Sequence, residues 1–228
     1  MDDYPALDDL RDDFDRLTAF DTGTWNHNSA YHRYLLRHLL PRFRTVLEIG
    51  CGAGAFARLL AQRSQKVLAL DLSPRMISLA KERSQRYQNI EYIVADGLSY
   101  PLPLAGFDCV VSISTLHHLD LAVALARLAD LVRPGGVLLV LDLYRAASIM
   151  DHLLSALALP VSLFLRLWHG DARRKPVPVR KAWSAHRCHE RIVTLAQAHR
   201  ICAVTLPGAQ LRRHLLWCYS IIWTRPNG

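Results

Sequence analysis

Short apolar segments alternate with helical ones over residues 45–144, and this alternation constrains the fold more than any other feature of the sequence. Each apolar segment is followed by a stretch with helical spacing, so that one strand and one helix recur together. Such a rhythm is typical of a parallel sheet with helices on both faces. The sequence predicts five strands of this sheet, at 45–51, 66–72, 90–96, 107–114 and 137–144.

Capping residues and a glycine pair mark where the predicted helices begin and where one strand is expected to start. Ser73, Asp120 and Thr194 can each accept a hydrogen bond from the first turn of a helix. The sequence RPGG at 133–136 is expected to break the chain before the fifth strand. The predicted helices are 55–64, 75–87, 121–132 and 195–206.

The rhythm changes in the next segment, where an apolar stretch at 148–168 precedes a basic, proline-containing stretch at 169–183. The apolar stretch is interrupted by four residues that a membrane span avoids: Asp151, His152, Pro160 and Arg166. We therefore expect a pair of amphipathic helices packed as a lid, in preference to a helix that lies on a membrane surface.

Two apolar segments near the C-terminus, 209–217 and 218–225, are predicted to be closing strands. The chain has 228 residues, of which 51% are hydrophobic, and this suffices for a single domain with a large core. We divide the domain 1–228 into four parts: an N-terminal helical cap (1–44), a ligand-binding core (45–144), a helical lid insertion (145–193) and a closing helix with two strands (194–228).

Charge is distributed unevenly along the chain, which has a formal net charge of +8. Residues 1–48 include 6 basic and 9 acidic residues, whereas residues 145–228 include 13 and 3. Such an excess fits an anionic small molecule, RNA or an anionic membrane surface, but is more often a solvated face. Five cysteines without a CxxC pair and an acidic N-terminus indicate a cytoplasmic protein with reduced thiols.

Three glycines follow the first predicted strand, so a bulky group can approach the backbone at Gly50, Gly52 and Gly54. This turn falls at the carboxyl edge of the predicted sheet, where ligands bind. A dinucleotide site needs the spacing G-x-G-x-x-G, and here the third glycine comes one residue early. Glu48 precedes the turn inside the strand, where a buried acid would pair with a ligand amine and would repel a pyrophosphate.

Five motifs in register resemble those of the class I S-adenosylmethionine-dependent methyltransferases, of the small-molecule, methyltransferase-11 type. VLEIGCGAG (46–54), LALDLS (68–73) and IVADG (93–97) are similar to that family's motifs at the ends of its first three strands. FDCVVSISTLHHL (107–119) and LVRPGGVLLVLDL (131–143) are similar to its fourth strand and the turn before its fifth. The resemblance implies an α/β fold with a Rossmann-like, seven-stranded, mostly parallel sheet. Its last strand would be antiparallel, with helices on both faces and a helical lid after the fifth strand.

The resemblance also implies a binding site for S-adenosyl-L-methionine, which would leave as S-adenosyl-L-homocysteine. Glu48 and the turn from Gly50 to Gly54 would hold the amino acid end of the cofactor. Asp71 would hold both ribose hydroxyls, although Asp71 taken alone could equally cap a helix or turn. Asp96 and Gly97 would face the adenine, where Asp96 has the same alternative.

The remaining residues of the expected cofactor site lie beside these motifs or in the N-terminal segment. Leu72 and Met76 are placed to pack against the adenine ring. The N-terminal segment is rich in polar and aromatic groups, and it would cover the cofactor or would instead pack as a helix against the sheet. The further residues that we assign to the site or its cover are Cys51, Ser114, Trp25, His27, Asn28 and Tyr31.

Three histidines are candidates for catalysis, because methyl transfer is an in-line displacement that needs a base only when the acceptor must lose a proton. His117 and His118 follow the fourth strand and are expected near the methyl group, as a general base or as hydrogen-bonded loop residues. His189 could reach the acceptor from the lid. The spacing H-x-C-H at 186–189 does not match a zinc site, so we expect no metal.

The methyl acceptor is expected to be a small molecule, either anionic or lipid-like, that is methylated on oxygen or nitrogen. The fourth strand ends in SIST and lacks the N/D-P-P-Y motif of enzymes that methylate amino groups of DNA and RNA bases. The basic C-terminal third has no interleaved aromatic residues, which argues against nucleic acid. Two alternatives stay open: an RNA- or ribosome-directed methyltransferase that uses this basic third, and a non-catalytic binding protein of the same fold.

Overall fold

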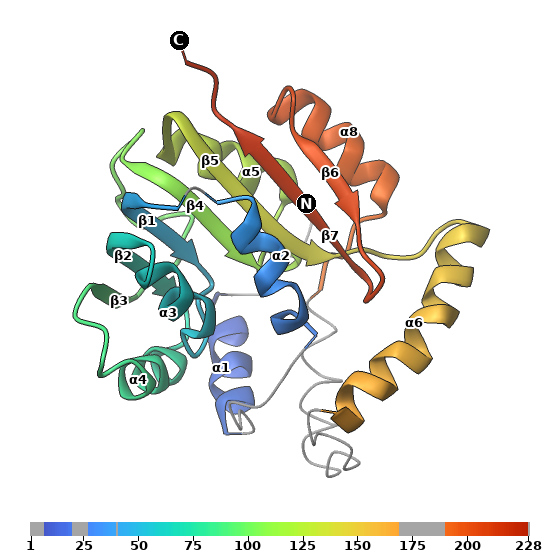
Figure 1. The fold of residues 1–228 in the computed structure, drawn as a ribbon, viewed down its shortest axis with the longest axis horizontal. Helices are drawn as coiled ribbons and strands as arrows, with labels where there is room; N and C mark the ends of the chain where they lie inside the picture. The colour runs from blue at the N-terminus through green and yellow to red at the C-terminus, as the bar shows by residue number, and fades with distance from the viewer. Residues whose placement is uncertain (1–6, 20–26, 40, 169–189, 228) are drawn as a thin grey trace.

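The computed structural model describes residues 7–19, 27–39, 41–168 and 190–227. At its centre is a seven-stranded sheet with the order β3-β2-β1-β4-β5-β7-β6 (Figure 1). The first five strands are parallel to one another, and β7 runs antiparallel to both β5 and β6. The predicted α/β class and the antiparallel last strand are confirmed. The strands are β1 (Phe43–Ile49), β2 (Ser64–Asp71), β3 (Ile90–Val94), β4 (Phe107–Ile113), β5 (Val132–Leu143), β6 (Gln210–Arg213) and β7 (Cys218–Thr224).

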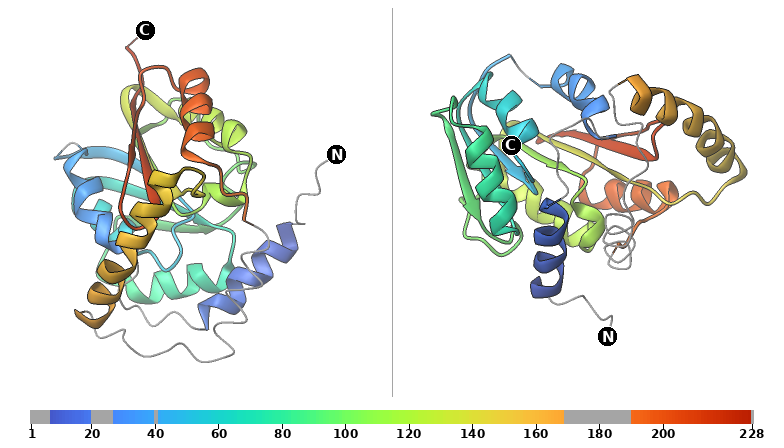
Figure 2. Two further views of the ribbon diagram at one scale, coloured as in Figure 1. Left: turned by 90° about the vertical axis from the view of Figure 1, so that its right-hand side faces the viewer. Right: turned by 90° about the horizontal axis from the view of Figure 1, so that it is seen from below.

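Helices cover both faces of the sheet, as predicted (Figure 2). On one face, α2 (His32–Arg37), α3 (Ala55–Ala61) and α4 (Pro74–Arg83) bury apolar side chains in a shared core. On the other face, α5 (Leu121–Leu131) and α8 (Leu195–Thr205) form a second core. Because both faces are covered, the central strands are mostly apolar, and each of their fully buried leucines contributes about 1.5–3 kcal/mol.

The three predicted N-caps are confirmed. Met76 N–H donates to the Ser73 hydroxyl, and Val123 N–H donates to the Asp120 carboxylate, each at 3.0 Å. Thr194 caps α8 and exchanges hydrogen bonds with the third residue of that helix, so both members of a capping box are present. Local sequence therefore sets the starts of α4, α5 and α8.

The sequence RPGG at 133–136 does not break the chain, so that prediction is wrong. β5 begins at Val132 and continues through this segment, although its register against β4 shifts there. Gly135 N–H donates to the Arg225 carbonyl, and Arg225 N–H donates to the Gly136 carbonyl, each at 2.9 Å. The chain that leaves β7 thus supplies hydrogen-bond partners that hold both glycines in the sheet, although Gly135 has a φ of +73°. Local propensity alone could not reveal these partners.

α6 (Ile149–Trp168) is one continuous helix of 20 residues, and it stands beside the β6–β7 end of the sheet (Figure 1). Pro160 lies inside the helix without ending it, although proline removes one helical hydrogen bond. Among the described helices, α6 alone is long and apolar enough to cross a membrane, judged by length and composition only. The second helix of the predicted lid would fall in residues 169–189, which lie outside the described residues.

The described part of the N-terminal cap consists of α1 (Leu7–Thr18), the short helix η1 (Ser29–Tyr31) and α2. α1 packs beside α4, where the Ser73 hydroxyl donates a hydrogen bond to the Asp15 carboxylate. Ser73 directly follows the β2 strand end, so this contact brings α1 to the carboxyl edge of the parallel strands.

Candidate functional site

The glycine turn between β1 and α3 is packed at two positions and open at the third. Gly50, Gly52 and Gly54 have φ angles of +73°, +50° and +73°. Residues other than glycine rarely adopt such positive φ angles. A Cβ on Gly50 would lie 1.9 Å from Thr115 Oγ1, and one on Gly54 would lie 2.3 Å from the Tyr92 hydroxyl. A Cβ on Gly52 would meet none of the described atoms within 4 Å. Space for a ligand at this turn is therefore at Gly52.

Glu48 is a buried acid in the strand that leads into this turn. Only 2% of its surface is exposed, and within the described part of the chain its Oε2 atom has no hydrogen-bond partner. Burial, with a smaller contribution from the Asp71 carboxylate, raises the pKa of Glu48 to about 8, while the Arg58 guanidinium opposes the rise. A buried carboxyl without a partner costs free energy, which a cationic ligand group would offset.

Asp71 ends β2 and uses both carboxylate oxygens to hold nearby backbone. Its Oδ2 accepts a hydrogen bond from Gly52 N–H at 2.7 Å, and its Oδ1 accepts one from Ser73 N–H at 2.9 Å. Burial raises the pKa of Asp71, although these two hydrogen bonds lower it. The turn-capping alternative is thus realised, but each oxygen keeps a further lone pair. Binding of ribose hydroxyls at Asp71 stays a prediction.

Asp96 follows β3 and lines a cavity of about 300 Å³ at the carboxyl edge of the sheet. Its Oδ1 also accepts a hydrogen bond from Leu98 N–H at 3.1 Å, so it caps a turn as well. The cavity brings Asp96 together with His118, which sequence analysis placed on a different strand end. The other lining residues are mostly apolar and come from α1 and from the chain after β3 and β4: Leu7, Leu10, Leu98, Leu119, Asp120 and Val123.

The two neighbouring histidines after β4 have different surroundings, although their rings lie 4.2 Å apart. His117 is buried, and its Nδ1 lies 2.5 Å from Asp142 Oδ1 near the end of β5. Burial lowers the pKa of His117, but the Asp142 and Glu190 carboxylates outweigh burial, so the pKa is raised. His118 packs its ring edge-on against Phe14 of α1. Since a carboxylate stabilises an imidazolium, His117 is the better placed of the two to accept a proton.

The other assigned residues at the strand ends have packing roles that sequence analysis did not show. Ser114 has a φ of +51°, and its buried hydroxyl has no partner among the described residues. A Cβ on Gly97 would lie 2.4 Å from Ile49 Cγ2, so glycine allows close packing there. Cys51 is buried, and burial raises the pKa of its thiol. The assigned residues beside the start of α4 are Leu72 and Met76, which are half-buried.

The N-terminal segment contacts the β6–β7 turn. The Tyr31 hydroxyl accepts a hydrogen bond from Leu216 N–H at 2.9 Å, and burial raises the pKa of Tyr31 to about 12. His27 Nε2 lies 2.8 Å from the Ser162 hydroxyl of α6. These contacts lie beside β5 and β7, on the side of β1 opposite to β2 and β3. A role for Tyr31 in covering the cofactor stays a prediction. The two assigned residues outside the described part of the chain are Trp25 and His189.

Sequence analysis missed Asp142 and a group of rings at the β6–β7 turn. Asp142 interrupts the apolar run of β5, and this is the same signal of a buried acid that identified Glu48. The rings of Tyr31 and Tyr34 lie 4.8 and 4.7 Å from the ring of His214. No local pattern could have indicated that group, because α2 and the β6–β7 turn are distant in sequence.

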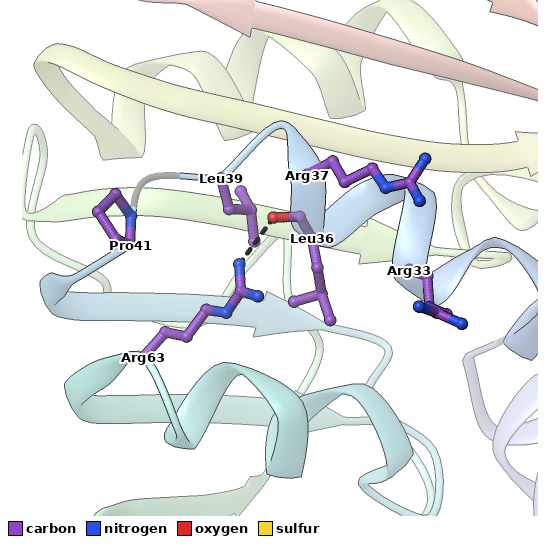
Figure 3. Close-up of a pocket in the computed structure, with 6 residues that line it drawn as sticks. All are labelled: Arg33, Leu36, Arg37, Leu39, Pro41 and Arg63. Atoms are coloured by element: carbon purple, nitrogen blue, oxygen red, sulfur yellow. Dashed lines mark hydrogen bonds between the residues drawn. The ribbon is translucent and has the colours of Figure 1, made fainter.

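A larger cavity, of about 580 Å³, lies at the opposite, amino edge of the sheet (Figure 3). Arg63 Nη1 donates to the Leu36 carbonyl at 2.8 Å across this cavity. The chain enters β1 and β2 here, so the cavity is separate from the glycine turn at the carboxyl edge. Three arginines and three apolar residues line it: Arg33, Arg37, Arg63, Leu36, Leu39 and Pro41.

The fold is Rossmann-like, and its carboxyl edge, where sheets of this kind generally bind ligands, holds a buried acid and an open glycine position. A family model described as a methyltransferase domain matches residues 47–140. An uncharacterized methyltransferase of Mycobacterium bovis is 32% identical over 207 residues, which cover 89% of this chain and 98% of that protein. The chain therefore belongs to the class I S-adenosylmethionine-dependent methyltransferases, whose cofactor is S-adenosyl-L-methionine.

Two further similarities concern proteins whose names state an activity. The malonyl-[acyl-carrier protein] O-methyltransferase of Serratia marcescens is 40% identical over 95 residues, which are 41% of this chain and 36% of that protein. The solved N-methyltransferase NodS of Bradyrhizobium japonicum, in complex with S-adenosyl-l-homocysteine, has a TM-score of 0.65 and 20% identity. That comparison covers 96% of this chain and 99% of that chain. It shows that the two proteins share a fold.

Proposed function

We propose that this protein transfers a methyl group from S-adenosyl-L-methionine to a hydroxyl or amino group of a small acceptor with an apolar part. The observation that carries the proposal is the buried carboxyl of Glu48, which has an oxygen without a partner among the described residues. An edge used only for packing would gain nothing from such a group, which costs about 1–3 kcal/mol. An ammonium group is the partner that would offset this cost.

The residues at the carboxyl edge fit the three parts of the cofactor. Glu48 would pair with the ammonium of its amino acid end, next to the open position at Gly52. Asp71 orients the Gly52 N–H and has lone pairs left for ribose hydroxyls. The mostly apolar cavity beside Asp96 suits an adenine ring. When bound, the cofactor supplies a methyl group on a sulfonium, and the protein has to position the acceptor in line with it.

We place the acceptor on the β5–β7 side of the glycine turn. The His117–Asp142 pair lies at the ends of β4 and β5. The rings at the β6–β7 turn lie further from β2 than this pair does, because β7 and β6 follow β5 in the sheet. Aromatic side chains that carry polar atoms suit an acceptor that is apolar at one end and polar at the other. The rings of this group are those of Tyr31, Tyr34 and His214.

The His117–Asp142 pair suits the role of a general base. Asp142 accepts a hydrogen bond from Nδ1–H of His117, which leaves Nε2 as the atom that takes a proton from the acceptor. Nε2 would take the acceptor proton as the acceptor oxygen or nitrogen bonds to the methyl carbon. The bond from that carbon to sulfur would break at the same time and leave S-adenosyl-L-homocysteine. The similarity to an O-methyltransferase of Serratia marcescens supports transfer to oxygen. Four buried, free cysteines among the described residues support a reducing compartment such as the cytoplasm.

Calorimetric titration tests the cofactor half of this proposal. Wild type, Glu48→Gln and a control variant, Glu91→Gln, are titrated with S-adenosyl-L-methionine, S-adenosyl-L-homocysteine and NAD. Glu91 pairs with Lys66 on the exposed surface of β2 and β3, so its change should leave binding intact. We expect the first two ligands to bind wild type and the control, and Glu48→Gln to weaken both. NAD binding, or full affinity in Glu48→Gln, would contradict the proposal.

A further inference from the structure

The side of α6 that faces the protein mixes polar and apolar residues, while the side that faces solvent is largely apolar. An ordinary surface helix exposes its polar side instead. Asp151 and Ser162 are buried, and Ser155 and Arg166 are half-buried. At about 100° per residue, the exposed apolar side chains occupy roughly half of the circumference of the helix. They include six side chains that are each more than half exposed: Leu153, Leu157, Leu159, Leu163, Phe164 and Leu167.

Two contacts fix this orientation of α6. The Asp151 carboxylate pairs with the Arg213 guanidinium of β6 at 2.8 Å and also accepts the N–H of Ser148 at 3.0 Å. Further along the helix, the Ser162 hydroxyl lies 2.8 Å from His27 Nε2. Rotation of α6 to bury its leucines would break both contacts. The apolar face therefore points outward in the folded protein, and an exposed apolar patch of this kind marks an interaction site.

The charges on α6, in the sequence after it and on α2 favour an anionic surface as the binding partner of the apolar face. The one acid of the helix, Asp151, is paired with Arg213. The sequence that follows the helix, 169–189, contains six basic residues and one acidic residue. α2 lies on the same side of the sheet as α6 (Figures 1 and 2). Its Arg33 and Arg37 are exposed. Insertion of an apolar helix face together with attraction of basic residues is the usual basis for binding to anionic lipids.

We propose that α6 is an interfacial helix that docks this protein on an anionic lipid membrane. The proposal goes beyond methyl transfer and does not depend on it, because membrane binding is measurable without turnover. The helix lies on the membrane and does not span it, since the Asp151–Arg213 pair holds its first turn at the sheet. The part beyond Asp151 is about 25 Å long, shorter than the ~30 Å hydrocarbon core of a bilayer. The Ser162–His27 contact also keeps its second half against the protein.

Co-sedimentation of the full chain with lipid vesicles tests the proposal. One set of vesicles is phosphatidylcholine alone, and the other is phosphatidylcholine mixed with phosphatidylglycerol. The test variant combines Leu153→Ser, Leu157→Ser and Phe164→Ser on the outer face of α6. The matched control combines Leu104→Ser and Val204→Ser, two exposed apolar residues outside α6. Because all five side chains are exposed, both variants should fold, and circular dichroism checks this.

We expect wild type and the control to bind the anionic vesicles, with weaker binding to phosphatidylcholine alone and at high salt. The α6 variant should bind the anionic vesicles about tenfold more weakly or worse. Absence of binding by wild type, or equal binding by the α6 variant, would overturn the proposal. Light scattering supplies one more test, since a wild-type dimer that the α6 variant abolishes would identify a second copy of the chain as the occupant.

Discussion

His117 Nδ1 lies 2.5 Å from Asp142 Oδ1, and both side chains are buried at the ends of β4 and β5. Burial alone would lower the pKa of His117, yet the neighbouring carboxylates raise it. The pair therefore joins a candidate base to the residue that orients its ring and stabilises its protonated form. His118, although adjacent in sequence, lines the cavity with Asp96 and has α1 as its neighbour.

Asp142→Asn should lower kcat by about 10²-fold or more, because the amide cannot stabilise the imidazolium. The rise of activity with pH should move to lower pH, since His117 loses the carboxylate that raises its pKa. A pH profile of kcat checks both effects, and magnetic resonance titration of His117 checks the second without an acceptor. His199→Asn, on the exposed side of α8, is the matched control. An unchanged profile in Asp142→Asn would remove the base role of His117.

The same pair should make stability depend on pH. The folded pKa of His117 lies above the ordinary value of 6.5, so its stabilisation is fully present below pH 6.5. This contribution is lost as the pH rises through the raised pKa of the folded state. Urea unfolding of wild type and Asp142→Asn should therefore show the largest difference in free energy below pH 6.5. A difference that grows with pH would mean that the pair is not an ion pair in the folded protein.

Glu48→Gln should stabilise the free protein while it weakens cofactor binding. The pKa of Glu48 is about 8 in the folded state and ordinarily 4.5, so its stabilisation is lost between these two pH values as the pH rises. A neutral amide avoids this loss, and the gain above pH 8 should be on the order of 1–3 kcal/mol. Thermal unfolding with and without S-adenosyl-L-methionine measures both effects. If wild type is more stable at every pH, Glu48 has a partner in the free protein.

Alanine at Gly50 and at Gly52 should separate packing from ligand binding. Gly50→Ala would place a Cβ 1.9 Å from Thr115 Oγ1 at a positive φ, so we expect a loss of several kcal/mol of stability. Gly52→Ala meets no described atom and should cost only about 1 kcal/mol for its positive φ. Gly52→Ala should nevertheless weaken cofactor binding, because the alanine side chain fills the open space beside the turn. Unfolding and calorimetry on both variants test this, and normal affinity in Gly52→Ala would place the cofactor elsewhere.

Asp151→Asn should loosen the start of α6. Burial would raise the pKa of Asp151, but hydrogen bonds from Ala147, Ser148 and Arg213 lower it to about 2. Its contribution is therefore present above the ordinary value of 3.8 and is lost as the pH falls toward 2. Hydrogen exchange should become faster in the first turns of α6 at neutral pH, with little change in α8. Equal exchange in both proteins would show that Arg213 does not anchor the helix.

The sequence by itself determined the central strands, three helix starts and the edge at which we predict ligand binding. Short apolar runs between helical segments are typical of central strands that are buried on both faces, which is why β1, β2 and β4 were predicted with small errors at their ends. The glycine turn and Glu48 were visible because backbone conformation and the cost of a buried acid are local properties. The caps Ser73, Asp120 and Thr194 were predictable for the same reason, since each acts within one helical turn.

Only the tertiary structure decided which side chains act together. Asp142 reaches His117 across two neighbouring strands, and Arg225 holds the glycines that we expected to break β5. The outward direction of the apolar face of α6 likewise follows from the contacts of the helix with Arg213 and His27. The sequence shows how wide this face is but does not show whether it points toward the protein or toward solvent. In each case the partners are far apart in sequence, and their pairing depends on the register and packing of whole elements, which no local pattern encodes.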